Sequence, residues 1–549
     1  MPTFFKQFPV SERLLLFVLM LIYVHNLFID IMIVDAAEYA AMSAEMAHTR
    51  SFLQVKEFQE DYLDKPPFLF WISSLSIIIF GASNFSYKLP SFIFLLFSLY
   101  AVYRFCLLFY TQQVARYALI IFASCQAFFL MTNDVRTDAI LTSSVIGGIW
   151  LLSAFILKNE IKYLILGSIM VGIGMLVKGP IAFIAILIPL GFHLLYFGQW
   201  KQIFNWKWLI LLVIVAILLF PMCYGLYHQF DLHPEKITNG VKGQKGLYFY
   251  FWLQSFGRIT GENVWNNGLP WHFFLGSSIW DFFPWIIPLY VALFIFLKKW
   301  IWLRIKPVEF ISITGLVCLF AMFSLSEYKL PHYIFVTLPF AAILTAKYLA
   351  EMEEKLFMKW FYLFFGFGIL ILIMLMLYPI LFFPPYSILA IACILCQVVA
   401  LVYFYKKPKK TFTSLLGTVL VMNVFLSFVF YPKLLTYQAD SVAAKWAKEN
   451  SIPFIIYKTP SHSLSFYTKN PFIRVVQPND LLLISKPIWV FAEEKDYEEI
   501  KKYPVEILEV KKFESFRVAR LKLPFLLSKT RNKHLEYKYL IKIAKSSNI

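Results

Sequence analysis

Charged residues are scarce in this sequence of 549 residues: Asp, Glu, Lys and Arg make up 15% of it, whereas 60% of its residues are hydrophobic. Soluble globular chains carry about 25% charged and about 45–50% apolar residues. The low charge content and a mean hydropathy of +0.66 exclude a soluble enzyme and a disordered chain. We therefore expect the bilayer to surround most of the chain.

Cysteine is scarce too, and the six cysteines all lie inside apolar runs. Their spacing shows neither a disulfide framework nor a zinc site. Cys393 and Cys396 form a CxxC pair, but a thiolate is costly in hydrocarbon, so packing is the better interpretation. The first apolar run lacks a small-residue cleavage site, which predicts an uncleaved first helix.

Long apolar runs are abundant, and thirteen of them could each cross about 30 Å of hydrocarbon. They lie at about residues 13–33, 88–109, 115–131, 138–157, 162–177, 179–198, 207–227, 279–297, 308–325, 332–349, 358–380, 385–405 and 412–431. A further run, Phe68–Gly81, has about 14 residues and follows Lys65-Pro66-Pro67. Its length favours an interfacial or re-entrant helix.

The positions of lysine and arginine predict the orientation of these spans. With the N-terminus inside and residues 67–81 at the interface, six inner loops carry 17 Lys and Arg, and four short outer connections carry three. A spanning helix at 67–81 would reverse this bias. The positive-inside rule therefore predicts thirteen spans with the C-terminus outside, and the net charge of +18 needs no nucleic acid.

The composition also divides the chain into two predicted domains. Residues 1–432 are expected to form the transmembrane domain, with long outer segments at about 34–87 and 228–278. Residues 433–549 contain short β-like runs, such as 454–457 and 488–491, and amphipathic helical stretches at 441–449 and 496–502. The predicted fold is an α-helical polytopic membrane protein with a C-terminal soluble α/β domain outside. A basic, mobile tail is expected from Lys529 to Ile549.

Ionisable residues gather at the outer ends of the predicted spans, which suggests one shared outward-facing site. The residues are Asp35, Glu38, Asp64, Lys65, Asp134, Arg136, Asp138, Lys178, Glu327 and Lys329. Each has a structural alternative. Asp35 alone could be a helix cap, Lys178 alone could reach the headgroups, and Asp134 with Arg136 could form an ordinary loop ion pair. The functional interpretation depends on both signs of charge meeting on one face.

Short motifs in these segments occur in a characteristic order. They are Asp35-Ala36-Ala37-Glu38-Tyr39-Ala40, Lys65-Pro66-Pro67-Phe68, Thr137-Asp138, Lys178-Gly179-Pro180 and Lys329-Leu330-Pro331-His332-Tyr333. The ordered set resembles the polyprenyl-phosphate-sugar-dependent glycosyltransferases, and most of all the bacterial lipid A aminoarabinose transferases and their relatives, the protein O-mannosyltransferases. The resemblance runs from the first helix to about residue 340.

The resemblance implies a GT-C fold in the bacterial inner membrane, with a cytoplasmic N-terminus and a periplasmic C-terminal domain. It implies an inverting glycosyltransferase that takes a sugar from an undecaprenyl-phosphate carrier. Asp35 would be the principal catalytic carboxylate, and Asp138 would position the acceptor or a metal. The groups expected at the donor phosphate are Lys65, Lys178, Arg258, Tyr39 and Tyr333. Lipid A, another glycan or a protein all stay open as acceptors.

The sequence also departs from the aminoarabinose branch. That branch usually has Glu before Lys-Pro, Arg before the Tyr of the first motif, and a histidine in the second long outer loop. Here Asp64, Glu38 and Ser255 stand at these positions. A divalent metal site built on Asp64 would lack the expected histidine, and the phosphate cluster is less positive.

Two other functions are compatible with a chain of many apolar helices. A protein O-mannosyltransferase-like enzyme would share the same motifs. A secondary transporter should show internal repeats and ionisable residues near the middle of the membrane. The sequence shows no repeat, and its charges lie at the outer helix ends.

Overall fold

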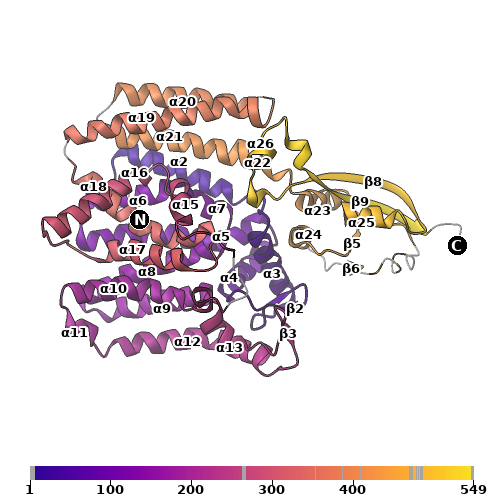
Figure 1. Cartoon of the computed structure of the whole chain (residues 1–549), viewed down its shortest axis with the longest axis horizontal. Helices are drawn as coiled ribbons and strands as arrows, with labels where there is room; N and C mark the ends of the chain where they lie inside the picture. Colours follow the sequence, from indigo (N-terminus) through magenta and orange to yellow (C-terminus); the bar gives the residue numbers. More distant parts are fainter. Residues whose placement is uncertain are drawn as a thin grey trace.

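The computed structural model describes residues 7–262, 267–352, 354–385, 387–407, 410–468, 474–475, 477, 479, 481 and 486–545. Most helices run side by side along the long axis of the molecule, and a β-sheet lies beyond one end of this bundle (Figure 1). Each of the thirteen predicted runs contains a helix of the bundle. The helices are α2 (Val10–Asn26), α5 (Asn84–Phe109), α6 (Gln112–Ser124), α7 (Gln126–Asn133), α8 (Thr137–Lys158), α9 (Ile161–Lys178), α10 (Ile181–Tyr196), α12 (Trp208–Leu226), α16 (Ile286–Leu297), α17 (Ile311–Leu325), α18 (Leu338–Ala350), α19 (Glu354–Leu377), α20 (Ile388–Lys406) and α21 (Thr411–Phe425).

The length and hydropathy of these helices make the chain a multi-span membrane protein. Within the described residues, eight helical stretches are long and apolar enough to cross a bilayer. The number is ten if two bent pairs each count as one span: α6 with α7, bent by 55°, and α15 (Phe273–Asp281) with Ile286–Trp302, bent by 118°. The exact count of thirteen stays a prediction.

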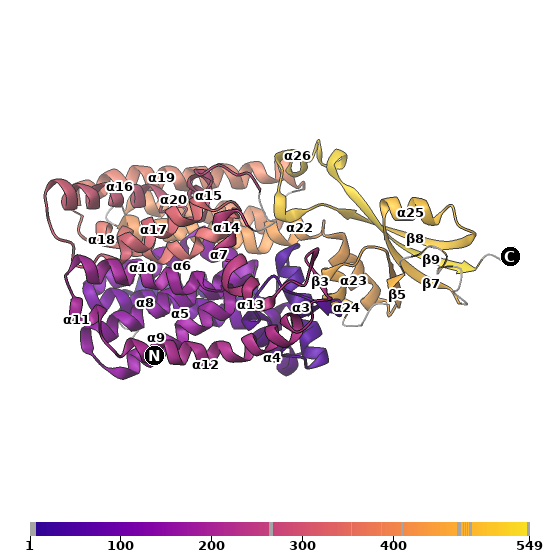
Figure 2. The same ribbon diagram turned by 60° about the horizontal axis from the view of Figure 1, so that its bottom comes forward.

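Two short helices of the first outer segment lie at the end of the bundle nearest the sheet, α3 (Asp35–Thr49) and α4 (Phe68–Phe80) (Figures 1 and 2). They pack on each other: the Tyr39 ring meets Phe70 edge-on, with centroids 5.8 Å apart, and Ser74 donates a hydrogen bond to the Ser43 carbonyl. The helix predicted at 68–81 is therefore present, with 13 residues. Its depth in the bilayer stays a prediction.

The C-terminal segment forms a five-stranded sheet in the order β6-β5-β7-β9-β8. The strands are β5 (Phe454–Tyr457), β6 (Arg474–Val475), β7 (Ile488–Glu493), β8 (Val505–Ser515) and β9 (Glu536–Lys545). β5 pairs in parallel with β6 and β7, and β9 pairs antiparallel with β7 and β8. Helices α23 (Ala439–Glu449), α24 (His462–Thr468) and α25 (Glu494–Ile500) accompany the sheet. The boundary at residue 432 stays a prediction.

The expectation of a mobile tail from residue 529 is wrong for residues 536–545, because they form the inner strand β9. Leu540, Ile541 and Ile543 are buried in this strand, and three lysines, Lys538, Lys542 and Lys545, lie before, between and after them in the sequence. One of these lysines, Lys538, forms an ion pair of 2.8 Å with Asp440. The basic composition of the segment therefore did not indicate that it contains a buried apolar strand.

The C-terminal segment is joined to the bundle directly before the first outer helix. The Tyr467 hydroxyl accepts a hydrogen bond from the Ile31 amide at 2.9 Å, and Gln438 bonds the backbone of Ile31 and Ile33. Lys445 forms an ion pair with Asp30. These contacts fix the backbone that leads into Asp35, so the sheet helps to position the start of α3.

Candidate active site

Asp35 is the first residue of α3, where the N-terminal end of the helix dipole favours a negative charge. Arg136, in the connection between α7 and α8, donates from Nη1 to Asp35 Oδ2 at 2.5 Å. Its Nε also donates to Asp134 Oδ2 at 2.9 Å. Burial opposes the charge of Arg136, but the charges of Asp134 and Asp35 outweigh it and raise the arginine pKa above its ordinary value.

The two partners of this ion pair differ in exposure. The Asp35 side chain is 31% exposed, and that of Arg136 is 17% exposed. Arg136 holds only one carboxylate oxygen, Oδ2, and no described residue donates a hydrogen bond to the other, Oδ1. Asp35 is thus held in place on one side and accessible on the other, as a base or an acceptor-orienting group must be.

A second ion pair lies at the same end of the bundle. Lys178, the last residue of α9, donates to Oδ1 of Asp138, in the first turn of α8, at 2.5 Å. The Lys178 ammonium also lies 4.3 Å from the centroid of the Tyr333 ring, a cation–π distance. Both ionised side chains are largely buried, with 14% and 5% exposed.

The Lys178 side chain depends on a tight turn. Gly179 ends α9 with φ +79°, a conformation that favours glycine, and its N–H caps the Met175 carbonyl at 2.8 Å. A Cβ added there would lie 3.3 Å from the Ser255 hydroxyl oxygen. The second outer segment therefore reaches the site through Ser255, whose hydroxyl is buried without a partner among the described residues.

His332 connects the two ion pairs. It lies at the start of a 3-10 helix, Pro331–Thr337. Its Nδ1 is 3.4 Å from Arg136 Nη1, and its Nε2 is 3.6 Å from Asp138 Oδ2. Residues from four different outer connections thus form one cluster, which we call the outer charge cluster: Asp35, Asp134, Arg136, Asp138, Lys178 and His332.

Two further polar pairs flank this cluster on the first outer segment. Lys65 Nζ lies 2.6 Å from Asp64 Oδ2, and the Tyr62 hydroxyl donates to Glu38 at 2.8 Å. Burial raises the pKa of Glu38 to about 7, although the hydrogen bond from Tyr62 opposes the shift. Glu38 therefore titrates near neutral pH.

The structure brings most of the predicted site residues to one place. Asp35, Asp138, Lys178 and Tyr333 are connected by the contacts above. Tyr39 is buried beside Asp35, Glu38 and Asp64, and burial together with these negative charges raises its pKa well above the ordinary value. Arg258 belongs to the short helix Gly257–Thr260, but its side chain lies outside the described part of the chain.

Sequence reasoning missed the central place of Arg136 and His332. The ion pair expected between Asp134 and Arg136 is present, but Arg136 also reaches Asp35 and approaches His332. The signals in the sequence were the density of polar residues at 133–138 between two apolar runs and, for His332, the motif Lys329-Leu330-Pro331-His332-Tyr333.

The residues present do not fit a metal site on Asp64. Asp64 is paired with Lys65, and the position expected to supply a histidine ligand holds Ser255. No group of three His, Cys, Asp or Glu side chains suited to a metal ion occurs in the described ranges.

Comparison with known proteins gives three kinds of similarity. The family model for dolichyl-phosphate-mannose-protein mannosyltransferases matches residues 64–224. The undecaprenyl phosphate-alpha-4-amino-4-deoxy-L-arabinose arabinosyl transferase of Wigglesworthia glossinidia brevipalpis is 27% identical over 58% of this chain and 55% of the relative. A second transferase of the same name, from Proteus mirabilis, is 25% identical over 59% of this chain and 56% of its own length. The chain thus matches about half the length of these curated relatives.

A solved structure matches along almost the whole chain. The crystal structure of ArnT from Cupriavidus metallidurans bound to undecaprenyl phosphate has a TM-score of 0.70 at 16% identity, over 96% of this chain and 97% of that one. The chain therefore has the fold of this structure and the helices of a multi-span membrane protein. The resemblance to the polyprenyl-phosphate-sugar-dependent glycosyltransferases, predicted from the ordered motifs, is confirmed by these relatives.

Proposed function

We propose that the chain is an inverting glycosyltransferase that moves a sugar from an undecaprenyl-phosphate-linked donor to an acceptor at the outer face of the bacterial inner membrane. The observation that carries this proposal is the outer charge cluster, in which an accessible carboxylate, Asp35, lies beside buried cations. The relatives named for transfer from undecaprenyl phosphate-linked aminoarabinose support the donor class.

Donor recognition is assigned to the cations of the site. A lipid-linked phosphate needs charge-assisted hydrogen bonds, and these grow stronger as the sugar–phosphate bond breaks and charge collects on the phosphate. Lys65 and Lys178 supply ammonium groups, each already placed beside a carboxylate. Arg258 is the third proposed contact, and Tyr39 and Tyr333 are the proposed hydroxyl donors.

Acceptor activation is assigned to Asp35. The acceptor oxygen attacks the anomeric carbon from the face opposite the phosphate, the bond to the phosphate oxygen breaks, and the electron pair leaves with the phosphate. If the acceptor is a hydroxyl, its proton passes to Asp35, while a phosphate acceptor needs orientation more than base catalysis. Asp138 is proposed to position the acceptor.

Arg136 and His332 are positioning residues in this scheme. Arg136 holds Asp35 through one oxygen. His332 lies between Arg136 and Asp138, so a change at either ion pair can affect the other.

The orientation and the acceptor complete the proposal. We place the N-terminus in the cytoplasm and residues 433–549 in the periplasm, because the basic loops then lie inside. Lipid A is the proposed acceptor. A protein acceptor is the second candidate, and the match of residues 64–224 to the protein mannosyltransferase family favours it specifically.

Mass spectrometry of the envelope tests the proposal. Glycolipids and proteins are compared between cells that express the wild-type chain, cells that express an Asp35→Asn variant at equal level, and cells without the chain. A sugar-sized mass increase on lipid A that needs the wild-type chain supports the main proposal. The same increase on proteins supports the second candidate, and no increase on any envelope component contradicts both.

A further inference from the structure

A large cavity lies at the end of the bundle opposite the outer charge cluster. Its volume is about 700 Å³, and it lies between the end of α16, the segment after it and the end of α18. The length of helix α5 gives the distance between the outer charge cluster and the cavity. Asn84, at the start of this helix, contacts Asp30 and Tyr467 near the outer charge cluster. Its 26 residues span about 39 Å, and the Tyr110 ring just after its end lies 5.4 Å from Lys347 of the cavity.

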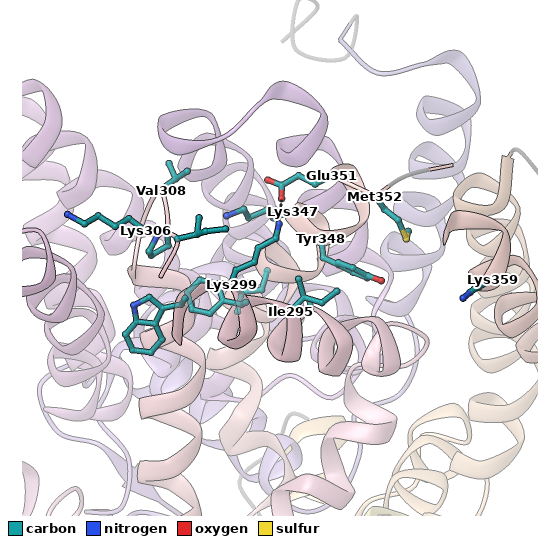
Figure 3. A pocket seen from close by; sticks show the side chains of 15 residues that line it. Ile295, Lys299, Lys306, Val308, Lys347, Tyr348, Glu351, Met352 and Lys359 are labelled. Atoms are coloured by element: carbon teal, nitrogen blue, oxygen red, sulfur yellow. Dashed lines mark ion pairs between the residues drawn. The ribbon is translucent and has the colours of Figure 1, made fainter. Parts of the chain in front are cut away.

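The charges that line this cavity are mostly positive. Lys299, Lys306, Lys347 and Lys359 line it with a single described carboxylate, Glu351 (Figure 3). Lys299 and Glu351 form a loose ion pair of 3.7 Å in which both side chains are about half exposed. Figure 3 shows Lys306 and Lys359 on opposite sides of this pair. The cavity therefore keeps an excess of positive charge.

The walls of the cavity are apolar. Ala292, Ile295 and Phe296 line it from α16, and Leu344 lines it from α18. The positive-inside rule explains lysines in loops, but it does not require them to surround an apolar cavity between two helices. A cavity with a cationic rim and a hydrocarbon-like wall is complementary to a lipid that carries a phosphate.

We propose that this cavity binds an anionic glycerophospholipid. Its phosphate lies among Lys299, Lys306 and Lys347, and one acyl chain follows the apolar wall of α16 and α18. Basic pockets between transmembrane helices on the cytoplasmic side are suited to anionic headgroups. A free phosphate or a nucleotide would use the same lysines but would leave the apolar wall in contact with water, so the lipid is the better match.

Binding is measured on the full chain in detergent by native mass spectrometry, with phosphatidylglycerol as the probe and phosphatidylethanolamine as the neutral reference. The wild type should bind one phosphatidylglycerol more tightly than phosphatidylethanolamine. A Lys299→Gln/Lys347→Gln variant should bind phosphatidylglycerol about 30-fold more weakly, because each lysine near an anionic lipid contributes roughly a factor of five.

Two further variants separate lost binding from damaged folding. Glu351→Gln removes the carboxylate that competes with the lipid for Lys299, so the affinity of this variant for phosphatidylglycerol should rise about fivefold. A misfolded protein could not show such a rise. Lys158→Gln/Lys201→Gln removes the same charge from two positions outside the cavity lining and should leave the affinity unchanged.

Three results would overturn the proposal. They are equal binding of both lipids, equal loss of affinity in the two double lysine variants, or displacement of phosphatidylglycerol by millimolar inorganic phosphate at constant ionic strength. The last result would mean that the cavity takes a soluble anion instead. None of these measurements depends on sugar transfer.

Discussion

The two ends of the helical bundle carry their charges in opposite ways. At the outer end, Asp138 and Lys178 are paired at 2.5 Å, with 5% and 14% of their side chains exposed. At the other end, Lys299 and Glu351 are 3.7 Å apart and about half exposed. Buried charges are costly to desolvate and rarely improve stability over apolar residues, whereas exposed lysines cost little. The paired end is therefore the one whose charges need a chemical explanation.

The largest expected effect concerns Asp35. Asp35→Asn keeps the shape of the side chain but removes the base, so sugar transfer to a hydroxyl acceptor should fall about 10³-fold. The turnover number is measured with purified protein and an undecaprenyl-phosphate-linked sugar, with insertion checked by membrane fractionation. Full activity in this variant would show that Asp35 is not the catalytic carboxylate.

Lys178→Gln should have the next largest effect, and it acts on both function and stability. It removes a proposed phosphate contact and leaves Asp138 buried without its cation, which costs about 3 kcal/mol. The thermal midpoint and transfer should both fall. A Lys178→Gln/Asp138→Asn double variant should regain stability but not activity. Recovery of activity as well would reduce this pair to a structural role.

A smaller, pH-dependent effect is expected at Glu38. Because the folded pKa of this residue is raised to about 7, the folded state holds the proton more tightly than the unfolded chain. Its contribution to stability is therefore present below the unfolded pKa and is lost as the pH rises toward 7. Between pH 6 and 8 the new carboxylate charge should raise the KM for the donor about fivefold, since it repels the phosphate.

Glu38→Gln is the matched variant for this pH effect, because it keeps the size of the side chain but cannot ionise. Its KM should stay flat between pH 6 and 8. A rise in KM equal to that of the wild type would place the titrating group elsewhere in the site.

The smallest effect is expected at the opposite end of the bundle. Lys299→Gln/Lys347→Gln should change the turnover number and the thermal midpoint little, because exposed ion pairs contribute at most about 1 kcal/mol. The measurement is made in a fixed detergent and lipid mixture. A loss of sugar transfer as large as the loss in Lys178→Gln would contradict the view that only the outer end of the bundle carries the chemistry.

The sequence predicted the positions of the apolar helices well and the site in part. Apolar runs report burial in lipid directly, so each predicted run holds a helix. The contact between Asp35 and Arg136 joins residues 101 positions apart, and no local pattern encodes such a pairing. Arg136 therefore looked like a loop residue, although it holds the proposed catalytic carboxylate.

The end of the chain shows the opposite error. Lysines at 538, 542 and 545 suggested a solvated tail, but the apolar residues between them fill an inner strand. The net charge of this segment gave no sign that its apolar residues are buried. Their burial depends on pairing with the strands β7 and β8, which come earlier in the chain.

In the proposed orientation, the paired charges face the periplasm and the lysine-rich end faces the cytoplasm, so that sugar transfer occurs outside. Reporter fusions at Lys407 and Lys533 test it most directly, with one reporter active only in the cytoplasm and one active only in the periplasm. We expect a cytoplasmic signal at Lys407 and a periplasmic signal at Lys533. The reverse pattern would place Asp35 and its partners inside the cell and contradict the proposed site of sugar transfer.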